Sequence, residues 1–176
     1  MDQVSELTVG LPPFINRVAV VVNPAEKELE KIRASGLFDY IQFHGSEDPA
    51  LLKSTELKSI KAISIEDSRD LKEIKKYQQA ADYLLFDTKI GNQSGGTGKS
   101  FDWLLIEDLN IPYLLAGGLG PDNIREALKK LNPAAVDINS RVENEPGKKN
   151  HRLLKETVEK IRNHISVSET KIKINN

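Results

Sequence analysis

Short runs of β-branched and other apolar residues alternate along this chain with longer stretches in which apolar residues recur every three or four positions. Such short runs are typical of buried strands, and the longer periodic stretches are typical of amphipathic helices. Regular alternation of the two predicts repeated βα units built around a parallel sheet. We expect six strands, at residues 17–22, 40–43, 59–63, 83–86, 113–115 and 135–138.

A helical pattern follows each expected strand. Start signals support several of these helices, because Pro24 and Pro121 suit a first helical turn and Asp122 places a negative charge near a helix N-terminus. The expected helices span residues 24–35, 48–54, 68–80, 101–107, 121–131 and 151–164.

No stretch rich in Pro, Gly or Ser divides the chain, so residues 1–176 are expected to form a single domain, with residues 168–176 as a frayed polar tail. Repeated βα units fit either a closed eight-stranded barrel or an open doubly wound sheet. Six units are too few to close the usual barrel, which takes at least about 200 residues. The pattern alone leaves both arrangements open.

Charge and cysteine content exclude several classes of function. The chain has 25 basic and 26 acidic residues and a net charge of −1, with the basic residues scattered. This argues against a nucleic-acid or anionic-membrane partner. The chain has no cysteine, which excludes disulfides, thiolate metal sites and a thiol base within it. We see neither a leader pattern nor an apolar run long enough to span a membrane, and we expect a cytoplasmic protein.

A single acid, Asp87, stands at the end of an apolar strand and directly before a glycine-rich segment, in the sequence LLFDTKIGNQSGGTGKSFDW. Reacting groups of α/β proteins lie at the carboxyl ends of strands, so Asp87 is a candidate catalyst, and a structural ion pair is the alternative. The segment GTGKS is not a P-loop, because Gln93 stands where that motif requires glycine. We expect instead a loop whose glycines let it close over a ligand.

Two later loops have the composition of anion sites. Gly117 and Gly118 stand between a strand and a helix in LAGGLGPDN, where glycine lets the backbone approach a ligand; a tight βα turn is the alternative. The next strand leads into AVDINSRVENEPGKKN, which offers Asn139, Ser140 and Arg141. In βα barrels the last two loops commonly hold a phosphate, so these loops together suit a phosphorylated substrate.

Polar residues also occur beside and within the apolar strands. Gln42 and His44 flank Phe43, so strand alternation places both on the face opposite Phe43. His44 is equally compatible with a ligand contact and with a structural role. Lys61 and Asp137 lie inside expected strands, where a buried charge needs a partner.

Six motifs, taken in order, resemble the phosphoribosylanthranilate isomerase family of tryptophan biosynthesis. They are PPFINRVAVVVNP, YIQFHG, IKAISI, LLFDTK with GGTGKSFDW, LAGGLGPDNI, and AVDINSRVE with PGKK, and they extend over nearly the whole chain. The resemblance implies a TIM-type (βα)8 barrel, of which this chain contains about six βα units. It also implies an Amadori rearrangement of N-(5'-phosphoribosyl)anthranilate, a phosphorylated small-molecule substrate, and no metal or organic cofactor.

By position in these motifs, the resemblance implies a role for each candidate residue. Asp87 would be the general acid that protonates the furanose oxygen as the sugar ring opens to a Schiff base. The substrate would also contact Gln42, His44 and Asp137. The phosphate would lie on Gly117, Gly118, Asn139, Ser140 and Arg141.

The chain departs from the family in several respects. The arginine that the family uses for the anthranilate carboxylate is missing with its first two βα units, and Asn150 stands where the family usually has aspartate. The family's general base is a cysteine in a Lys-x-Cys-Gly strand of the first βα units, and this chain has no cysteine. Arg141 replaces a glycine of the family's phosphate loop, where it could add a bidentate contact or occupy the phosphate's space. Two functions therefore stay open: the isomerase, and a non-catalytic phosphosugar-binding or partner-binding remnant of the barrel.

A sheet with fewer strands than a closed barrel has parallel edges without a neighbour. Such edges carry unpaired backbone groups and readily pair with another chain. We therefore expect either a homo-oligomer or a complementing chain that joins through the exposed edges.

Overall fold

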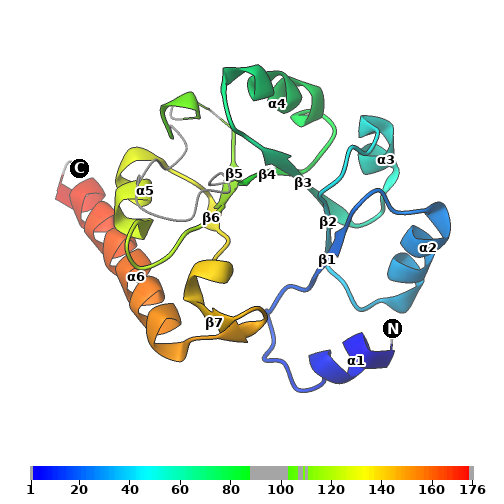
Figure 1. The fold of residues 1–176 in the computed structure, drawn as a ribbon, viewed down its shortest axis with the longest axis horizontal. Helices are drawn as coiled ribbons and strands as arrows, with labels where there is room; N and C mark the ends of the chain where they lie inside the picture. Colours follow the sequence, from blue (N-terminus) through cyan, green and yellow to red (C-terminus); the bar gives the residue numbers. More distant parts are fainter. Residues whose placement is uncertain (1, 88–102, 107–108, 110, 175–176) are drawn as a thin grey trace. The chain divides into compact units, whose positions relative to one another are not determined.

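The computed structural model describes residues 2–87, 103–106, 109 and 111–174 (Figure 1). Its six main strands follow one another in the order β1, β2, β3, β4, β5, β6. The neighbours β1 and β2, β2 and β3, and β5 and β6 pair in parallel. Sequential order is the topology of a βα barrel, whereas a doubly wound sheet reverses its strand order midway. The barrel alternative is therefore the correct one, with about six βα units in this chain.

All six expected strands are present, and their ends lie close to the predicted ones. They are β1 (Val18–Val21), β2 (Tyr40–Phe43), β3 (Lys58–Ser64), β4 (Tyr83–Asp87), β5 (Tyr113–Ala116) and β6 (Ala135–Val136). The α-helices are α1 (Asp2–Thr8), α2 (Glu26–Ser35), α3 (Pro49–Ser54), α4 (Leu71–Tyr77), α5 (Ile124–Lys130) and α6 (His151–Ile174). Short 3₁₀ segments are η1 (Ser68–Asp70), η2 (Trp103–Leu105) and η3 (Ser140–Val142), and a hairpin consists of β7 (Glu143–Glu145) and β8 (Lys148–Lys149).

Several predicted helices have different ends in the structure. The helix expected at 68–80 is divided into η1 and α4, the one at 121–131 is confined to α5, and α6 continues through Ile174, across most of the expected polar tail. Neither α1 nor the β7–β8 hairpin was expected. The glycine-rich loop at 88–102 lies outside the described residues, as do parts of the helix expected at 101–107. None of the described helices has both the length and the apolar character needed to cross a bilayer.

The chain divides into two compact units. Unit 1 consists of Met1–Ile63 with Lys72–Leu85, and unit 2 consists of Ser64–Leu71 with Phe86–Asn176. In unit 1, α2 and α3 lie on one side of β1 and β2 (Figure 1). Helix α2 begins where the Glu28 carboxylate accepts a 2.9 Å hydrogen bond from the Ala25 backbone, and it ends at Gly36, whose φ of 61° is left-handed.

Strand β1 exposes an apolar face. Ala19 is only 6% exposed, whereas its neighbours Val18, Val20 and Val22 are 40%, 60% and 65% exposed. Val18 and Val20 belong to β1, which stands at the end of the sheet order, and Val22 follows it directly; the three valines are called here the β1 edge. The preceding segment adds further exposed apolar side chains, at Leu7, Val9, Leu11, Phe14 and Ile15. Unit 1 therefore presents apolar surface of the kind that another polypeptide covers.

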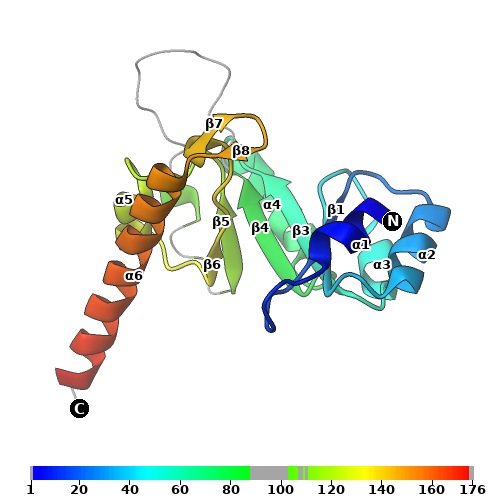
Figure 2. The same ribbon diagram turned by 90° about the horizontal axis from the view of Figure 1, so that it is seen from below.

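Unit 2 is built around β5, β6, α5 and α6. The rings of Phe86 and Tyr113 pack with their centroids 5.1 Å apart, and the Lys160 ammonium on α6 donates a 2.9 Å hydrogen bond to the carbonyl of Pro121. After β6 the chain turns through η3 and the β7–β8 hairpin before it enters α6 (Figure 2). This hairpin returns the chain to the carboxyl end of β6, where two of the candidate loops meet.

Candidate active site

Asp87 is the last residue of β4, and its side chain is half-buried. Its backbone carbonyl accepts a hydrogen bond of 3.3 Å from the backbone N–H of Ile65, which follows β3. Asp87 therefore occupies the carboxyl end of a strand, as the sequence predicts, and this is the end at which barrel enzymes place their reacting groups.

The loop after β5 approaches η3 closely within unit 2. Gly117 and Gly118 both have left-handed φ values, 87° and 59°, which favour glycine. Asn123 closes the loop, because its side-chain amide donates to the Gly118 carbonyl at 3.0 Å and its amide oxygen accepts from the Gly120 N–H at 3.0 Å. A Cβ atom placed on Gly120 would lie 2.8 Å from the Cβ of Arg141. The two loops predicted to hold phosphate are thus in contact.

Lys149, on β8, adds a cation that the sequence analysis did not single out. Its ammonium donates to the backbone carbonyl of Asn139 at 3.2 Å and to the Asn139 side-chain oxygen at 2.5 Å. It also pairs with Glu143 at 2.6 Å, and this hydrogen bond holds the pKa of Glu143 below its usual value. The sequence feature that could have indicated Lys149 is the PGKK segment, because its Gly147 has a left-handed φ of 81° and forms the turn of the hairpin.

Asp137 differs from the expectation. Strand β6 ends at Val136, one residue earlier than a strand containing Asp137 requires, and the Asp137 side chain is exposed. Its backbone N–H still donates to the carbonyl of Leu115 at 2.8 Å. The prediction of a buried charge needing a partner was therefore wrong for Asp137. The residue nevertheless leads directly into the segment that contains Asn139.

Gln42 and His44 lie together in unit 1, at and just beyond the carboxyl end of β2. Gln42 is only 8% exposed, His44 is exposed, and the Gln42 side-chain amide is hydrogen-bonded to Nε2 of the His44 ring. Strand alternation correctly predicts that they share a face. The buried charge expected in β3 also has its partner, since Lys61 pairs with Glu47 at 3.0 Å.

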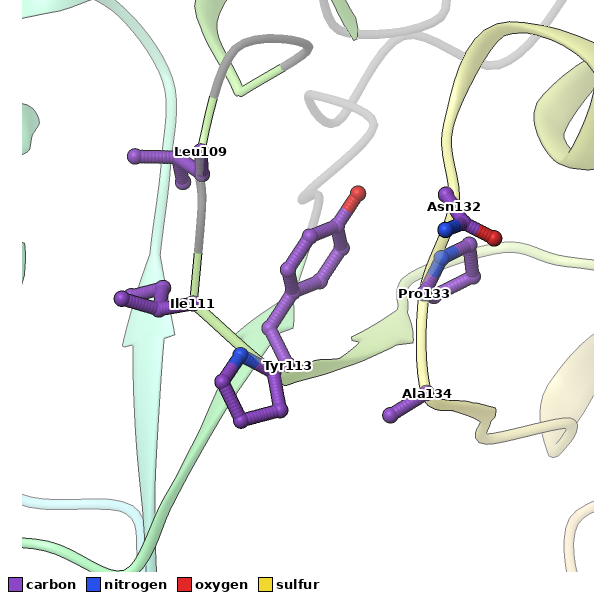
Figure 3. Close-up of a pocket in the computed structure, with 7 residues that line it drawn as sticks. Leu109, Ile111, Tyr113, Asn132, Pro133 and Ala134 are labelled. Carbon is purple, nitrogen blue, oxygen red and sulfur yellow. The ribbon is translucent and has the colours of Figure 1, made fainter.

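A pocket of about 560 Å³ lies elsewhere in unit 2, and Figure 3 shows the Tyr113 ring between the two segments that form it. Tyr113 begins β5, so the pocket lies at the amino ends of the strands, the end that serves stability in βα barrels. Burial raises the pKa of the Tyr113 hydroxyl, and a hydrogen bond from the Asn132 backbone offsets part of that effect. The lining residues are Leu109, Ile111, Pro112, Tyr113, Asn132, Pro133 and Ala134.

The structure thus brings the predicted residues together in two groups. Unit 2 unites the Gly117–Gly118 loop with the segment of Asn139, Ser140 and Arg141, and unit 1 unites Gln42 with His44. Within the described part of the chain, no three His, Asp or Glu side chains form a cluster suited to a metal ion. The strand order and the polar loops at the carboxyl ends define a protein of the βα-barrel class.

Comparison with known proteins identifies the family. A sequence profile described as "N-(5'phosphoribosyl)anthranilate (PRA) isomerase" matches residues 3–160. The N-(5'-phosphoribosyl)anthranilate isomerase of Petrotoga mobilis is 55% identical over 163 residues, which cover 92% of this chain and 79% of that protein. The isomerase of Magnetococcus marinus is 38% identical over 163 residues, covering 92% and 77% of the two chains. The chain belongs to the N-(5'-phosphoribosyl)anthranilate isomerase family.

Solved structures agree with this assignment. Phosphoribosyl anthranilate isomerase from Thermotoga maritima superposes with a TM-score of 0.82 at 34% identity, covering 92% of this chain and 80% of that one. A second structure of the isomerase holds reduced 1-(o-carboxyphenylamino)-1-deoxyribulose 5-phosphate; it superposes with a TM-score of 0.79 at 30% identity and covers 92% and 79%. The barrel fold and its strand order are therefore those of known isomerases.

Proposed function

We propose that this chain carries the general acid and the substrate-binding groups of an N-(5'-phosphoribosyl)anthranilate isomerase. The reaction is the Amadori rearrangement of N-(5'-phosphoribosyl)anthranilate to the open-chain carboxyphenylamino-deoxyribulose phosphate. One observation carries the proposal: in a chain of this family, the loops after β5 and β6 meet at Gly120, where an added Cβ would lie 2.8 Å from the Cβ of Arg141. Loops after the last two strands commonly bind a phosphate. A role in amino-acid biosynthesis also supports the expected cytoplasmic location.

Asp87 is proposed as the general acid that protonates the furanose oxygen while the ring opens to a Schiff base. Its position at the carboxyl end of β4 supports this role, because reacting groups of barrel enzymes lie there. A positioned general acid contributes about 10² to 10⁴-fold to a rate. Replacing Asp87 should therefore reduce turnover within this range while leaving phosphate binding intact.

The phosphate is proposed to bind on the surface formed by the two loops of unit 2. Left-handed glycines lack the side chains that would keep a phosphate away from the backbone. The exposed Arg141 guanidinium can donate two hydrogen bonds to phosphate oxygens, and the Lys149 ammonium adds positive charge beside Asn139. The proposed phosphate residues are Gly117, Gly118, Asn139, Ser140 and Arg141.

The other parts of the substrate are proposed to contact Gln42, His44 and Asp137. Gln42 and His44 are joined by a hydrogen bond, so they present one preformed polar pair. Asp137 is exposed directly after β6, where its carboxylate can accept hydrogen bonds from sugar hydroxyls. A neutral imidazole and an amide can both donate and accept, which suits the hydroxyl and carboxylate groups of this substrate.

The general base is proposed to come from a complementing βα segment that carries the family's Lys-x-Cys-Gly strand. This chain has no cysteine, so a second copy of it cannot supply the thiol. Strand β1 stands at the end of the sheet order, so its outer backbone edge is where such a parallel strand would pair. The exposed valines of the β1 edge, at 40%, 60% and 65%, are apolar side chains that the added segment could cover. The relatives from Petrotoga and Magnetococcus are longer, since this chain covers 79% and 77% of them.

Calorimetry with reduced 1-(o-carboxyphenylamino)-1-deoxyribulose 5-phosphate tests the proposed substrate site, because a related isomerase binds this compound. The wild-type chain should bind it. Gly120→Ala should weaken binding, because the added Cβ would lie 2.8 Å from the Cβ of Arg141 and displace η3. A folded wild-type chain that does not bind the compound contradicts the proposal.

A further inference from the structure

Lys61 on β3 and Glu47, just before α3, form an ion pair in the interior of unit 1. The Lys61 ammonium lies 3.0 Å from a Glu47 carboxylate oxygen, and the two side chains are only 3% and 1% exposed. Neither residue belongs to the proposed acid or phosphate groups. Burying two opposite charges gains little stability by itself, because a well-packed apolar pair of similar volume is often as stable. The other groups to which Lys61 and Glu47 are hydrogen-bonded indicate a role other than stability.

The remaining hydrogen bonds of Lys61 hold the backbone on both sides of His44. Its ammonium donates to the carbonyl of Phe43 at 3.2 Å and to the carbonyl of Gly45 at 2.6 Å. The His44 N–H itself donates to the carbonyl of Val21 at 2.9 Å. Three consecutive residues of this loop are therefore fixed, with His44 at the centre.

Glu47 holds the same loop from its other side. One carboxylate oxygen accepts from the N–H of Gly45 at 2.8 Å and from the N–H of Asn23 at 2.9 Å. The Tyr77 hydroxyl donates to the Glu47 backbone carbonyl at 2.7 Å, and the Tyr77 ring lies 5.1 Å from the Lys61 ammonium. Burial alone would raise the pKa of Glu47, but the hydrogen bonds that its carboxylate accepts, among them those from Asn23, Lys61 and Gly45, outweigh burial and keep the pKa below its usual value.

The space around Gly45 leaves no room for a side chain. A Cβ on Gly45 would lie 2.3 Å from the side-chain oxygen of Asn23 and 2.7 Å from a Glu47 carboxylate oxygen. That Asn23 oxygen accepts from the Ser46 N–H at 2.8 Å, so the loops after β1 and β2 are locked together.

We propose that Lys61 and Glu47 are positioning residues that hold His44, and through it Gln42, for contact with the part of the substrate other than its phosphate. This inference rests on the proposed function and adds two residues that act through His44. A misplacement of about 1 Å by a residue remote from the chemistry can cost about 100-fold in rate. Taking that size as the upper bound for binding, we expect a loss of about 10-fold to 100-fold in affinity for the non-phosphate part.

The test compares three variants of the full chain. Lys61→Met removes the ammonium that holds the carbonyls beside His44. Lys61→Met/Glu47→Gln also removes the orphaned carboxylate charge, so this variant should fold. Lys58→Met is the matched control, because Lys58 lies on the same strand and is exposed. Circular dichroism and thermal unfolding confirm that each variant is folded.

Two ligands separate positioning from general damage. The probes are inorganic phosphate, whose binding is measured by NMR, and reduced 1-(o-carboxyphenylamino)-1-deoxyribulose 5-phosphate, whose binding is measured by calorimetry. The double variant should bind phosphate as the wild type does but bind the larger compound about 10-fold to 100-fold more weakly, and Lys58→Met should bind both normally. Equal affinity of the double variant and the wild type for the larger compound overturns the inference. A wild-type chain that fails to bind it contradicts the proposed function instead.

The His44 ring signals in NMR spectra of the free protein give a readout that needs no ligand. They should shift and broaden in the double variant but not in Lys58→Met, and unchanged signals overturn the inference. The lost ammonium can also be restored chemically. Because the chain has no cysteine, a cysteine introduced at position 61 is the only thiol that an alkylating reagent can modify. Lys61→Cys, alkylated in denaturant with 2-bromoethylamine and refolded, restores an ammonium of nearly the same reach. This protein should regain the wild-type His44 signals, whereas capping with iodoacetamide should not restore them.

Discussion

Replacing Lys61 by methionine should destabilise unit 1 strongly. Methionine keeps an unbranched side chain of similar size but lacks the ammonium, which has partners at 3.2, 2.6 and 3.0 Å. Glu47 then retains its charge at a position where its side chain is 1% exposed. Its remaining hydrogen bonds, from Asn23 and Gly45, come from neutral backbone N–H groups. The substitution therefore leaves a buried charge without its counter-ion.

Breaking a buried ion pair by removing one partner costs about 3–5 kcal/mol. Because about 1.4 kcal/mol corresponds to a tenfold change in an equilibrium constant, openings of unit 1 should become roughly 100-fold to 4,000-fold more frequent. In Lys61→Met/Glu47→Gln the orphaned charge is gone, so most of this loss should be recovered.

Amide hydrogen exchange measures this effect locally. Amides of β2 and of β3 through Ile63 report on unit 1, and those of β5 report on unit 2 in the same sample. Exchange should accelerate in β2 and β3 of Lys61→Met and return close to the wild-type rate in the double variant. A loss below about 1 kcal/mol in the single variant, typical of a solvated pair, would refute the reasoning.

Three further predictions concern unit 1. Gly45→Ala should cost about 1–3 kcal/mol in urea unfolding, because its Cβ would lie 2.3 Å from the Asn23 side-chain oxygen; an unchanged midpoint contradicts the close approach. Val20→Asp should weaken binding of a complementing βα segment about 10-fold or more in a pull-down titration, since Val20 is 60% exposed on the edge; equal binding argues against that edge. The pKa of Glu47 is held below its ordinary 4.5, so its contribution to stability is complete above about pH 4.5 and lost as the pH falls through the folded-state value. Acid titrations of unfolding should show this loss in the wild type and a shallower dependence in Glu47→Gln.

The strands of this fold are predictable because each is a short apolar run flanked by turn residues. Their order is not, since a parallel βα pattern fits both a barrel and a doubly wound sheet until the pairings are known. The β7–β8 hairpin escapes prediction because its strands, ENE and KK, are short and polar and lack apolar alternation. The position of Lys149 beside Asn139 escapes prediction for the same reason.

The candidate site also contains residues that can be predicted from the sequence and residues that cannot. Asp87, Gln42 and His44 follow from strand ends and alternation, which are local properties of the sequence. A lysine inside an apolar strand predicts a buried partner for Lys61, but its identity as Glu47 depends on how a loop folds back over β3. Asp137 was misjudged because β6 ends at Val136, so the position read as a buried strand residue is an exposed loop residue.

Turnover of N-(5'-phosphoribosyl)anthranilate by the complemented chain tests the central claim most directly. The complement is the part of the Petrotoga mobilis isomerase that this chain does not match, since the match covers 79% of that protein. With it, the wild-type chain should catalyse the reaction, and Asp87→Asn should reduce kcat about 10² to 10⁴-fold without weakening phosphate binding. Asp122→Asn, at an exposed acid of unit 2, is the matched control and should leave kcat unchanged. Equal turnover by the wild type and Asp87→Asn would contradict the account.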